Sequence, residues 1–405
     1  MLSWQQARAM VIQVVRAQMP RPRRERVPLA RSLGRILAEP VSANRDLPPF
    51  PRSIRDGFAV RATDASVVPA EFDVVGEVKA GAGFDRTIEP GQAVRIMTGA
   101  PVPSGADAVV MIEHTRSLTE SRIAVDRPAK PGEHIVAQAS EALSGQRVLN
   151  PGLRIGFAEI ALLAGVGRSQ VGVFRQPRAA IVSTGDEIVP VDRQPGPFEI
   201  RDSNSSSLCA QVALAGGRPV PAGHAADDLP ELAGRIRAGL AADLLVLSGG
   251  VSKGKYDLVK DVLRDLGAEF QFESVAIRPG RPAVFAWCEG RPVFCLPGNP
   301  VSTMVTFELL VVPAIDLLSG AEPRALPLIL ARLAEPLEEK EGLGHFLPAR
   351  LDWTGSGLEA RRVPWRGSGD LAGVAQSNGF LLVPADRPRW QAGEMIEVLP
   401  RRELL

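Results

Sequence analysis

The sequence predicts a multidomain protein that combines an α/β domain with all-β parts. Its 405 residues exceed the length at which one hydrophobic core stops growing, so more than one domain is expected. Between residues 177 and 321, continuous apolar strand patterns alternate with amphipathic helical patterns, which is typical of a mostly parallel sheet covered on both faces. Residues 51–140 and 322–405 instead carry short β-type runs separated by Gly, Pro and Asp turns, which indicate two β domains.

The remaining residues, 1–50 and 141–176, are expected to form one discontinuous, helical N-terminal part that flanks the inserted β domain. Apolar residues recur at helical spacing from Trp4 to Val15, and Ser3 suits the N-cap of that helix. Residues 27–38 predict a second, short, partly helical segment. The helical pattern returns at 153–167, where its apolar face is expected to pack beside the first helix.

The composition excludes several classes of function. A net charge of +1 gives no case for a nucleic-acid partner or an anionic membrane surface. The three cysteines (Cys209, Cys288 and Cys295) show no metal-binding spacing, and unpaired cysteines are typical of a reducing compartment. The N-terminus lacks the features of a secretory leader, and no run of about 18 apolar residues is found. We therefore expect a cytoplasmic protein without a membrane-spanning helix.

Within the α/β domain, three loops that follow predicted strands are candidates for one binding site. Strands are predicted at 179–183, 244–247, 273–277 and 292–295, and helices at 205–215, 257–266 and 301–318. Ligands of such sheets bind beyond the carboxyl ends of the strands, where the strand order reverses. The loops at that edge are 183–187, 248–255 and 296–300.

The second of these loops, Ser248-Gly249-Gly250-Val251-Ser252-Lys253-Gly254, has the composition of a phosphate site. A strand, a small-residue loop and a helix start turn free backbone N–H groups toward an anion. Paired glycines let the backbone approach a phosphate closely. The loop is not a G-x-x-x-x-G-K-[ST] phosphate loop, and taken alone it is equally an ordinary connection between a strand and a helix.

Charged residues near these loops suit a phosphoanhydride and a divalent cation such as Mg²⁺, because phosphates need donors and the ion needs carboxylates. Candidate carboxylates are Asp186, Glu187, Asp227, Asp228 and Asp257. Arg278 and Arg281 bracket a Pro-Gly turn and form a fork suited to an oxyanion. Each of these residues taken alone is more often a solvated side chain. The stretch 202–205 either caps the following helix or closes the same crevice.

Two stretches of the first β domain are also dense in polar and turn residues. Asp56 precedes Gly57 at the entrance of a predicted strand, and taken alone this pair predicts a turn. Thr98 lies in a long loop, 97–110, and long ordered loops are often functional.

Together these stretches closely resemble the MoeA family of molybdopterin molybdenumtransferases, to which the E domains of plant and animal molybdenum-cofactor proteins belong. The matching motifs, in the family's order, are DGFAV, RIMTGAPVPSGADAVV, STGDE, DSN, SGGVSKGKYD, IRPGRP and LPGNPVS. The resemblance spans essentially the whole chain and weakens after Glu322. It implies an elongated four-part subunit, a homodimer, and a central molybdopterin-binding sheet like that of the molybdopterin adenylyltransferase, an implied partner.

The resemblance also implies a reaction. Adenylylated molybdopterin and molybdate are the substrates, Mg²⁺ is the cofactor, AMP is released, and molybdenum is left on the dithiolene. The implied catalytic residues are Asp56, Thr98, Glu187, Asp227 and Asp257, of which Glu187, Asp227 and Asp257 are also metal ligands. The implied substrate-binding residues are Ser183, Thr184, Gly185, Asp202, Asn204, Ser248, Gly249, Gly250, Ser252, Arg278, Arg281, Pro297, Gly298, Asn299 and Pro300. Asp56 and Thr98 are expected to face the α/β domain of the other subunit.

Two stretches depart from the family's pattern. Gly132-Glu133-His134 stands where relatives have Gly-Glu-Asp, and an imidazole does not replace a carboxylate as a hard-metal ligand. Residues 343–348 lack two arginines that relatives often carry in the last domain. The alternatives are a tungstate-using or otherwise altered paralogue, and a non-catalytic pterin-binding or scaffolding protein.

Overall fold

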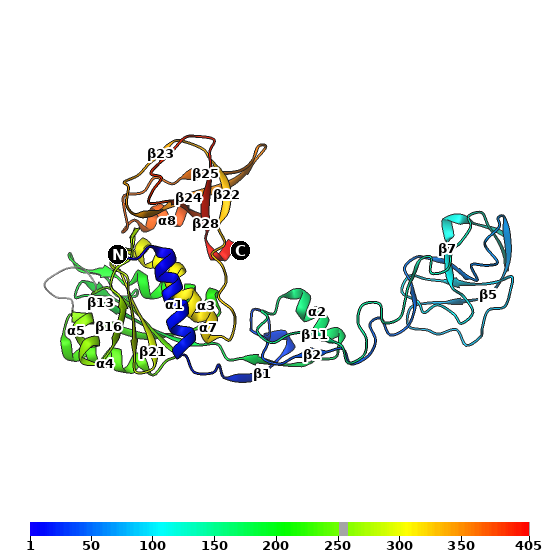
Figure 1. Ribbon diagram of the computed structural model, residues 1–405, viewed down its shortest axis with the longest axis horizontal. Coiled ribbons are helices and arrows are strands. Elements are labelled where there is room, and N and C mark those ends of the chain that lie inside the picture. Colours follow the sequence, from blue (N-terminus) through cyan, green and yellow to red (C-terminus); the bar gives the residue numbers. More distant parts are fainter. Residues whose placement is uncertain (251–257, 405) are drawn as a thin grey trace.

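The computed structural model describes residues 1–250 and 258–404. The molecule is elongated: an α/β domain and a C-terminal β barrel form one end, a narrow middle part follows, and a second β domain forms the far end (Figure 1). Both chain ends lie at the end of the molecule that contains the α/β domain. One continuous segment between them therefore runs out to form the middle part and the far domain and then returns. The predicted fold class is therefore confirmed.

The α/β domain is built on a six-stranded sheet of order β16-β13-β17-β21-β20-β18. The first four strands in this order run parallel and the last two are antiparallel to their neighbours, so the sheet is mostly parallel, as predicted. The chain passes from β13 to β16 on one side and then to β17 on the other, so the strand order reverses at β13. The strands are β13 (Arg178–Thr184), β16 (Arg218–Ala225), β17 (Leu244–Ser248), β18 (Glu269–Phe272), β20 (Val284–Cys288) and β21 (Arg291–Leu296).

Helices cover both faces of this sheet. On one face pack α4 (Leu229–Leu240) and α5 (Leu258–Asp265). On the other face pack α3 (Ser203–Ala215) and one long helix, Pro300–Leu318. The long helix consists of α6 (Pro300–Thr306), a π-helical turn η3 (Phe307–Val311) and α7 (Val312–Leu318).

Among the described residues, this long helix is the one that is long and apolar enough to cross a membrane, although the sequence analysis expected none. In the structure 83% of its apolar 18-residue window is buried inside the protein. Its apolar character is accounted for by packing between the sheet, α3 and the N-terminal helix.

The N-terminal helix α1 (Trp4–Gln18) begins at Ser3, whose hydroxyl oxygen accepts the amide hydrogen of Gln6, as predicted. Its buried residues Ala7, Val11 and Val15 join the core that contains α7. The second helix, α2 (Phe157–Gly165), belongs to the separate core of the middle part. The expected packing of these two helices is therefore wrong, because the apolar stripe of α1 is buried against the long helix instead.

The middle part is held together by three antiparallel strand pairs, each nested inside the previous one. They are β1 (Arg24–Pro28) with β12 (Gln170–Phe174), β2 (Val41–Ser42) with β11 (Arg147–Leu149), and β3 (Arg52–Ser53) with β10 (Ile135–Val136). The partly helical segment predicted at 27–38 is confirmed only over the 3₁₀ turn η1 (Leu29–Arg31), because its start belongs to β1. Pairing with a strand far along the chain overrides the local pattern.

The two β domains have the predicted runs as strands. The far domain has the order β7-β4-β6-β5-β9-β8, with β4 (Gly57–Val60), β5 (Ala70–Val78), β6 (Gln92–Ile96), β7 (Ala108–Met111), η2 (Ile112–His114), β8 (Thr115–Thr119) and β9 (Arg122–Val125). The C-terminal barrel comprises β22 (Ile329–Leu333), β24 (Gly344–Thr354), β25 (Gly357–Arg362), β26 (Gly379–Val383) and β28 (Met395–Pro400), and it closes because β24 pairs with both β25 and β26.

The remaining short elements connect these parts. They are β14 (Ile188–Val189), β15 (Ile200–Arg201), β19 (Ile277–Arg278), β23 (Leu337–Glu338), β27 (Arg389–Trp390), α8 (Leu371–Gln376) and η4 (Arg402–Leu404). The strand predicted at 273–277 is wrong except for an isolated bridge at Val275 and for its last residue. β18 ends at Phe272, and the chain turns before β19 joins the barrel strand β24.

Candidate functional site

The carboxyl ends of β13, β17 and β21 open into a cavity of about 860 Å³. The loops that follow these three strands form most of its wall, together with the start of α3 and residues at the start of α8. This is the edge at which the strand order reverses, the place where α/β sheets bind ligands. Of the predicted site residues, the wall contains Ser183, Thr184, Gly185, Glu187, Asp202, Asn204, Asp227, Ser248, Gly249, Gly250, Pro297, Gly298, Asn299 and Pro300.

The two glycines of the second loop hold it against the first loop. Gly249 and Gly250 have φ angles of 99° and 66°, in the region that favours glycine. A Cβ on Gly249 would lie 2.5 Å from the carbonyl oxygen of Thr184, and one on Gly250 would lie 2.5 Å from a methyl carbon of Val259. The glycine pair is therefore required for the packing of the cavity wall, and it also leaves the backbone open to a ligand.

Asn204, at the start of α3, ties the second and third loops together. Its Nδ2 donates to Ser248 Oγ at 2.8 Å and to the carbonyl oxygen of Gly298 at 2.7 Å. Two buried polar atoms of residues that line the cavity, Asn204 Oδ1 and Thr184 Oγ1, have no hydrogen-bond partner among the described residues. Buried polar atoms are almost always paired, so these two indicate a place for ligand atoms.

Asp202 serves both of the purposes that the sequence left open. Its Oδ1 accepts the amide hydrogen of Ser205 at 2.9 Å and so caps α3. Its Oδ2 accepts the hydroxyl hydrogen of Ser183 at 2.7 Å and so joins α3 to the first loop. Pro300 opens α6 in the first helical turn, as predicted.

Carboxylates crowd one side of the cavity. The amide of Asp227 donates to Asp186 Oδ1 at 2.9 Å. Burial raises the pKa of the Asp227 carboxyl, and the negative charges of Asp186 and Glu187 raise it further, while His224 opposes them. The His224 ring lies 2.7 Å from the carbonyl oxygen of Gly185, at the same edge. A concentration of negative charge of this kind favours a bound cation.

The described residues fit one mode of Mg²⁺ binding. Among them, no three potential ligand side chains converge on one point. Mg²⁺ is, however, commonly held by one or two protein carboxylates, with substrate phosphates and waters as the other ligands. Glu187 and Asp227, which both line the cavity, supply that number.

Asp56 and Thr98 lie far from this cavity in the same chain, because they belong to the far β domain, beside β4 and β6 (Figure 1). They contact each other: the amide and the hydroxyl of Thr98 donate to Asp56 Oδ1 at 2.6 and 2.9 Å. These two hydrogen bonds lower the pKa of the Asp56 carboxyl. The pair is built together, but it does not complete the cavity of its own subunit.

The two arginines predicted to bind an oxyanion are also outside the wall. Arg278 and Arg281 are exposed, and of this segment only Pro282 lines the cavity. The predicted residues Ser252 and Asp257 lie outside the described residues.

The sequence analysis missed several residues of the wall. Arg201 lines it directly before Asp202, and its place beside the DSN motif was an available signal. Gly369 and Leu371 reach the cavity from the C-terminal part. No local pattern in that part indicates contact with a sheet edge so far back along the chain.

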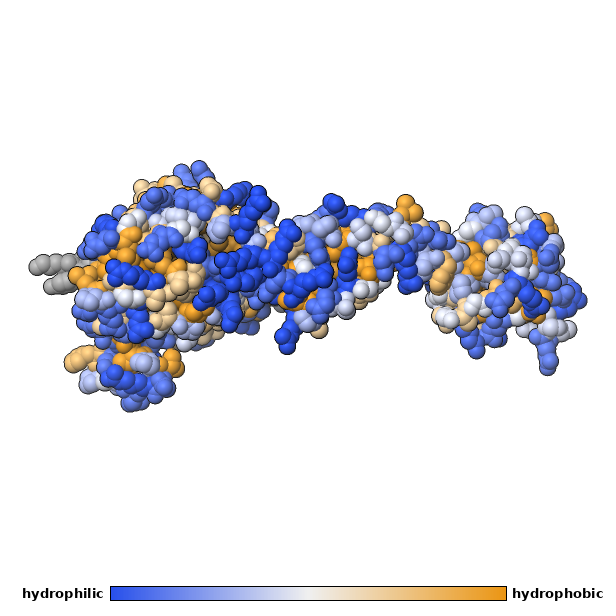
Figure 2. Space-filling model, turned by 90° about the horizontal axis from the view of Figure 1, so that it is seen from below, coloured by the Kyte–Doolittle hydropathy of each residue, from blue (hydrophilic) through white to orange (hydrophobic). Residues whose placement is uncertain are grey.

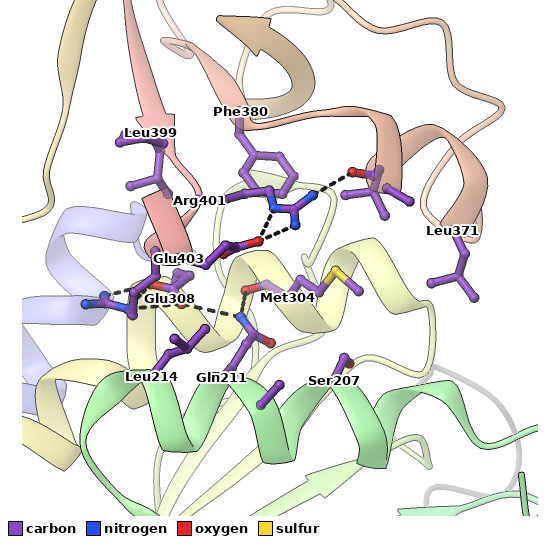
Figure 3. Close-up of a pocket in the computed structure, with 15 residues that line it drawn as sticks. Ser207, Gln211, Leu214, Met304, Glu308, Leu371, Phe380, Leu399, Arg401 and Glu403 are labelled. Atoms are coloured by element: carbon purple, nitrogen blue, oxygen red, sulfur yellow. Dashed lines mark hydrogen bonds and ion pairs between the residues drawn. The ribbon is translucent and has the colours of Figure 1, made fainter. Parts of the chain in front are cut away.

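A second cavity of about 300 Å³ lies between α3, the long helix and the C-terminal barrel (Figure 3). Leu371 lines both cavities. Apolar side chains such as Met304 and Phe380 form much of its wall, and the charged group of Glu308 is paired with Arg402 at 2.7 Å. No described residue of the strand-end loops lines this cavity, so the phosphate and cation chemistry is assigned to the first cavity.

Comparison with known protein families agrees with this geometry. Residues 2–167 match the family model described as "MoeA N-terminal region (domain I and II)", residues 180–317 match "Probable molybdopterin binding domain", and residues 330–400 match "MoeA C-terminal region (domain IV)". The fold and the site thus define a modular protein whose sheet-edge cavity lies in a domain of the molybdopterin-binding class.

Similar proteins cover nearly the whole chain. A protein of Bacillus subtilis named molybdopterin molybdenumtransferase is 35% identical over 94% of this chain and 90% of its own. One of Staphylococcus epidermidis with the same name is 34% identical over 92% of this chain and 90% of its own. The chain belongs to the MoeA family.

Two solved structures of molybdopterin biosynthesis MoeA protein from Pyrococcus horikoshii share the fold. One is 34% identical with a TM-score of 0.76 and covers 97% of this chain and 98% of its own. The other is 28% identical with a TM-score of 0.84 and covers 99% of this chain and 100% of its own.

Proposed function

We propose that this chain is a molybdopterin molybdenumtransferase, which inserts molybdenum from molybdate into adenylylated molybdopterin and releases AMP. The observation that carries the proposal is the sheet-edge cavity, which is lined by the three strand-end loops and by the carboxylates of Glu187 and Asp227. Donors for phosphate oxygens and carboxylates for a divalent cation are what cleavage of a phosphoanhydride requires. Family membership and the shared name of the similar proteins support the same activity.

In this proposal the residues of the chain bind and orient the substrates. Thr184 Oγ1 and Asn204 Oδ1 have no hydrogen-bond partner in the described part of the chain. In this proposal the Thr184 hydroxyl and the backbone of the glycine loop hold phosphate oxygens, and the Asn204 carbonyl accepts a donor of the ligand. Glu187 and Asp227 hold Mg²⁺, with Asp257 as the further carboxylate that the resemblance implies. When bound, Mg²⁺ neutralises charge on the phosphates.

Molybdate is proposed to approach the rim of the cavity. Arg278 and Arg281 are exposed there on either side of the Pro-Gly turn that precedes the wall residue Pro282. Guanidinium groups bind oxyanions through paired N–H donors, so these side chains suit capture of molybdate from solvent.

The proposal includes a homodimer. Asp56 and Thr98 are joined by two hydrogen bonds but lie in the far β domain. If they act in the reaction, they must reach the cavity of a second subunit. The elongated single chain supports this arrangement, since its far domain extends away from its own α/β domain (Figure 1).

The same proposal covers the organisation and setting of the protein. We propose the domain boundaries 1–50 with 141–176, 51–140, 177–321 and 322–405, with α1 of the first part packed on the core of the α/β domain. The protein works in the cytoplasm, with the molybdopterin adenylyltransferase as the partner that supplies its substrate.

The direct test is release of AMP by the purified protein from adenylylated molybdopterin in the presence of molybdate and Mg²⁺. Wild-type protein should release AMP only with Mg²⁺, and Asp257→Ala or Asp227→Asn should lower the rate about 100-fold or more, since a bound cation contributes several kcal/mol. Asp265→Asn, which changes an exposed acid at the end of α5, is the matched control.

The outcome separates the alternatives. Pterin binding without AMP release would contradict the enzymatic proposal and leave the non-catalytic, scaffolding function. Release that is faster with tungstate than with molybdate would instead identify a tungstate-using paralogue.

A further inference from the structure

A third cavity, of about 170 Å³ and polar, lies at the opposite edge of the central sheet from the candidate site. Its floor is formed where the parallel strands begin: Pro177 precedes β13, Asp243 precedes β17, and Arg291 opens β21. Its other wall is the end of the β1–β12 pair nearest the α/β domain. There the chain leaves for the middle part through residues 20–23 and returns at Arg175.

Arginine dominates this cavity. Arg21, Arg23, Arg175 and Arg291 line it, against one carboxylate, that of Asp243. Asp243 pairs with Arg175 at 3.2 Å and also accepts the amide hydrogen of residue 178 at 2.7 Å, so its charge is engaged. Three guanidinium groups therefore remain in excess. In the described part of the chain, Arg21, Arg23 and Arg291 have no ion-pair partner.

One arginine that lines the cavity carries a buried donor without a partner in the described part of the chain. Arg291 Nε has no hydrogen-bond partner among the described residues, and the single bond recorded for this side chain runs from Nη1 to the neighbouring Gly290 carbonyl oxygen at 3.3 Å. A buried, charged donor without an acceptor is costly unless an acceptor is supplied from outside the chain. The surface where the α/β domain meets the middle part is also strongly hydrophilic when seen from below (Figure 2).

We propose that this cavity binds a tetrahedral oxyanion, such as inorganic phosphate, molybdate or the phosphate group of a nucleotide. Several arginines that converge on one small polar cavity match the oxygens of such an anion better than any neutral ligand. The bound anion bridges Arg21 and Arg23 on the outgoing chain, Arg175 on the returning chain and Arg291 on the sheet. It thereby stiffens the joint between the α/β domain and the middle part.

The test is calorimetric titration of the full-length protein with phosphate, molybdate and AMP in separate experiments at constant ionic strength. Arg291→Ala and Arg23→Gln should each weaken one site by about tenfold or more, because each removes a charge-assisted hydrogen bond. Arg389→Ala should change nothing, since Arg389 is a 76% exposed arginine of the C-terminal barrel that is paired with Glu338. Arg23→Gln, on an exposed segment, keeps the test valid if Arg291→Ala fails to fold.

The three ligands also distinguish the source of the anion. The anion that binds most tightly to wild type, and whose binding is lost in both Arg291→Ala and Arg23→Gln, identifies the chemical class of the ligand. A second readout is hydrogen exchange, in which the bound anion should slow exchange of the β1 and β12 amides. The proposal is overturned if none of the three anions binds, or if wild type, Arg291→Ala and Arg23→Gln bind the same number of anions equally tightly.

Discussion

Asp227 lies near the carboxylates of Asp186 and Glu187, and negative charge is concentrated there in the candidate site. Burial and the charges of Asp186 and Glu187 raise its pKa. A raised carboxyl pKa means that the folded state favours the protonated acid. The favourable contribution of that form is complete below the pKa of the unfolded chain and is lost as pH rises through the folded pKa. At neutral pH the ionised side chain therefore opposes folding unless a cation is bound.

Asp227→Asn is expected to stabilise the apo protein at neutral pH and to weaken Mg²⁺ binding. The gain is less than about 1 kcal/mol, because Asp227 is exposed enough for solvent to screen the repulsion. It should shrink as pH falls through the raised pKa, as measured by thermal unfolding at several pH values. A gain that stays constant with pH, or that Asp265→Asn reproduces, would show that charge crowding is not the cause.

Asp316 joins three parts of the molecule at one buried carboxylate. It lies in α7 and its side chain is 0% exposed. Arg154 of the middle part donates to its Oδ1 at 3.0 Å. Arg324, in the connection to the C-terminal barrel, donates to Oδ1 at 2.8 Å and, through Nε and its backbone amide, to Oδ2 at 3.1 Å each. The carboxylate therefore accepts four hydrogen bonds and balances two cations.

Asp316→Ala is expected to destabilise the protein by about 3–5 kcal/mol, since it leaves two partly buried arginines without their partner. Asp352→Ala is the matched control, because Asp352 is 58% exposed and pairs with Arg350 at 3.2 Å. Its loss should cost less than about 1 kcal/mol. Urea unfolding monitored by tryptophan fluorescence compares the two variants. Equal losses would contradict the role of Asp316 as a joint between the three parts.

At the scale of elements, the second strand-end loop depends on backbone shape more than on side-chain chemistry. Gly250→Ala is expected to cost about 1–2 kcal/mol and to abolish ligand binding, because the new methyl group meets Val259 and a left-handed backbone. Gly234→Ala in the open part of α4 should instead stabilise the fold by about 0.5–1 kcal/mol. Thermal unfolding and AMP binding measure both variants; a neutral Gly250→Ala would show that the loop can rearrange.

Elements with a strong local pattern could be predicted from the sequence. The strands β13, β17 and β21 are continuous apolar runs, and parallel strands bring their carboxyl ends to one edge, so the three loops of the site followed from the pattern. The cap at Asp202 was one of the two roles that the sequence allowed, because a short polar side chain before a helix suits the N-cap.

Elements defined by distant partners could not be predicted. β1 (RERVP) is largely exposed and polar, and it is a strand only because β12 pairs with it. The surface against which α1 packs could not be predicted either. Residue spacing within α1 does not distinguish the core that contains the long helix from the core that contains α2. For the same reason Leu371 was missed at the site and the arginine fork at 278–281 was expected inside the wall.

At the scale of the whole molecule, Asp56 lies far from the cavity of its own chain (Figure 1). If both act in one reaction, each active site must contain residues of two subunits, which an enzyme with a site in a single chain does not require. Co-expression of Asp56→Ala and Asp227→Asn chains should restore about a quarter of wild-type activity, because half of randomly assorted dimers are mixed and each has one intact site. Each variant alone should remain inactive. AMP release from the unfractionated co-expressed protein measures this quarter, and the affinity-purified mixed dimer should reach about half of wild-type activity. Absence of recovery in verified mixed dimers would place Asp56 outside the shared site.

The nested pairs β1–β12, β2–β11 and β3–β10 also imply an order of assembly. The pair nearest the far domain joins residues closest in sequence, and each outer pair joins residues farther apart. Folding of the far domain brings the ends of β3 and β10 together, which shortens the loop that β2 and β11 must close. We expect refolding to run from the tip toward the α/β domain. In pulse-labelled hydrogen exchange, the amides of β3 and β10 should become protected first and those of β1 and β12 last. The reverse order would contradict this order of assembly.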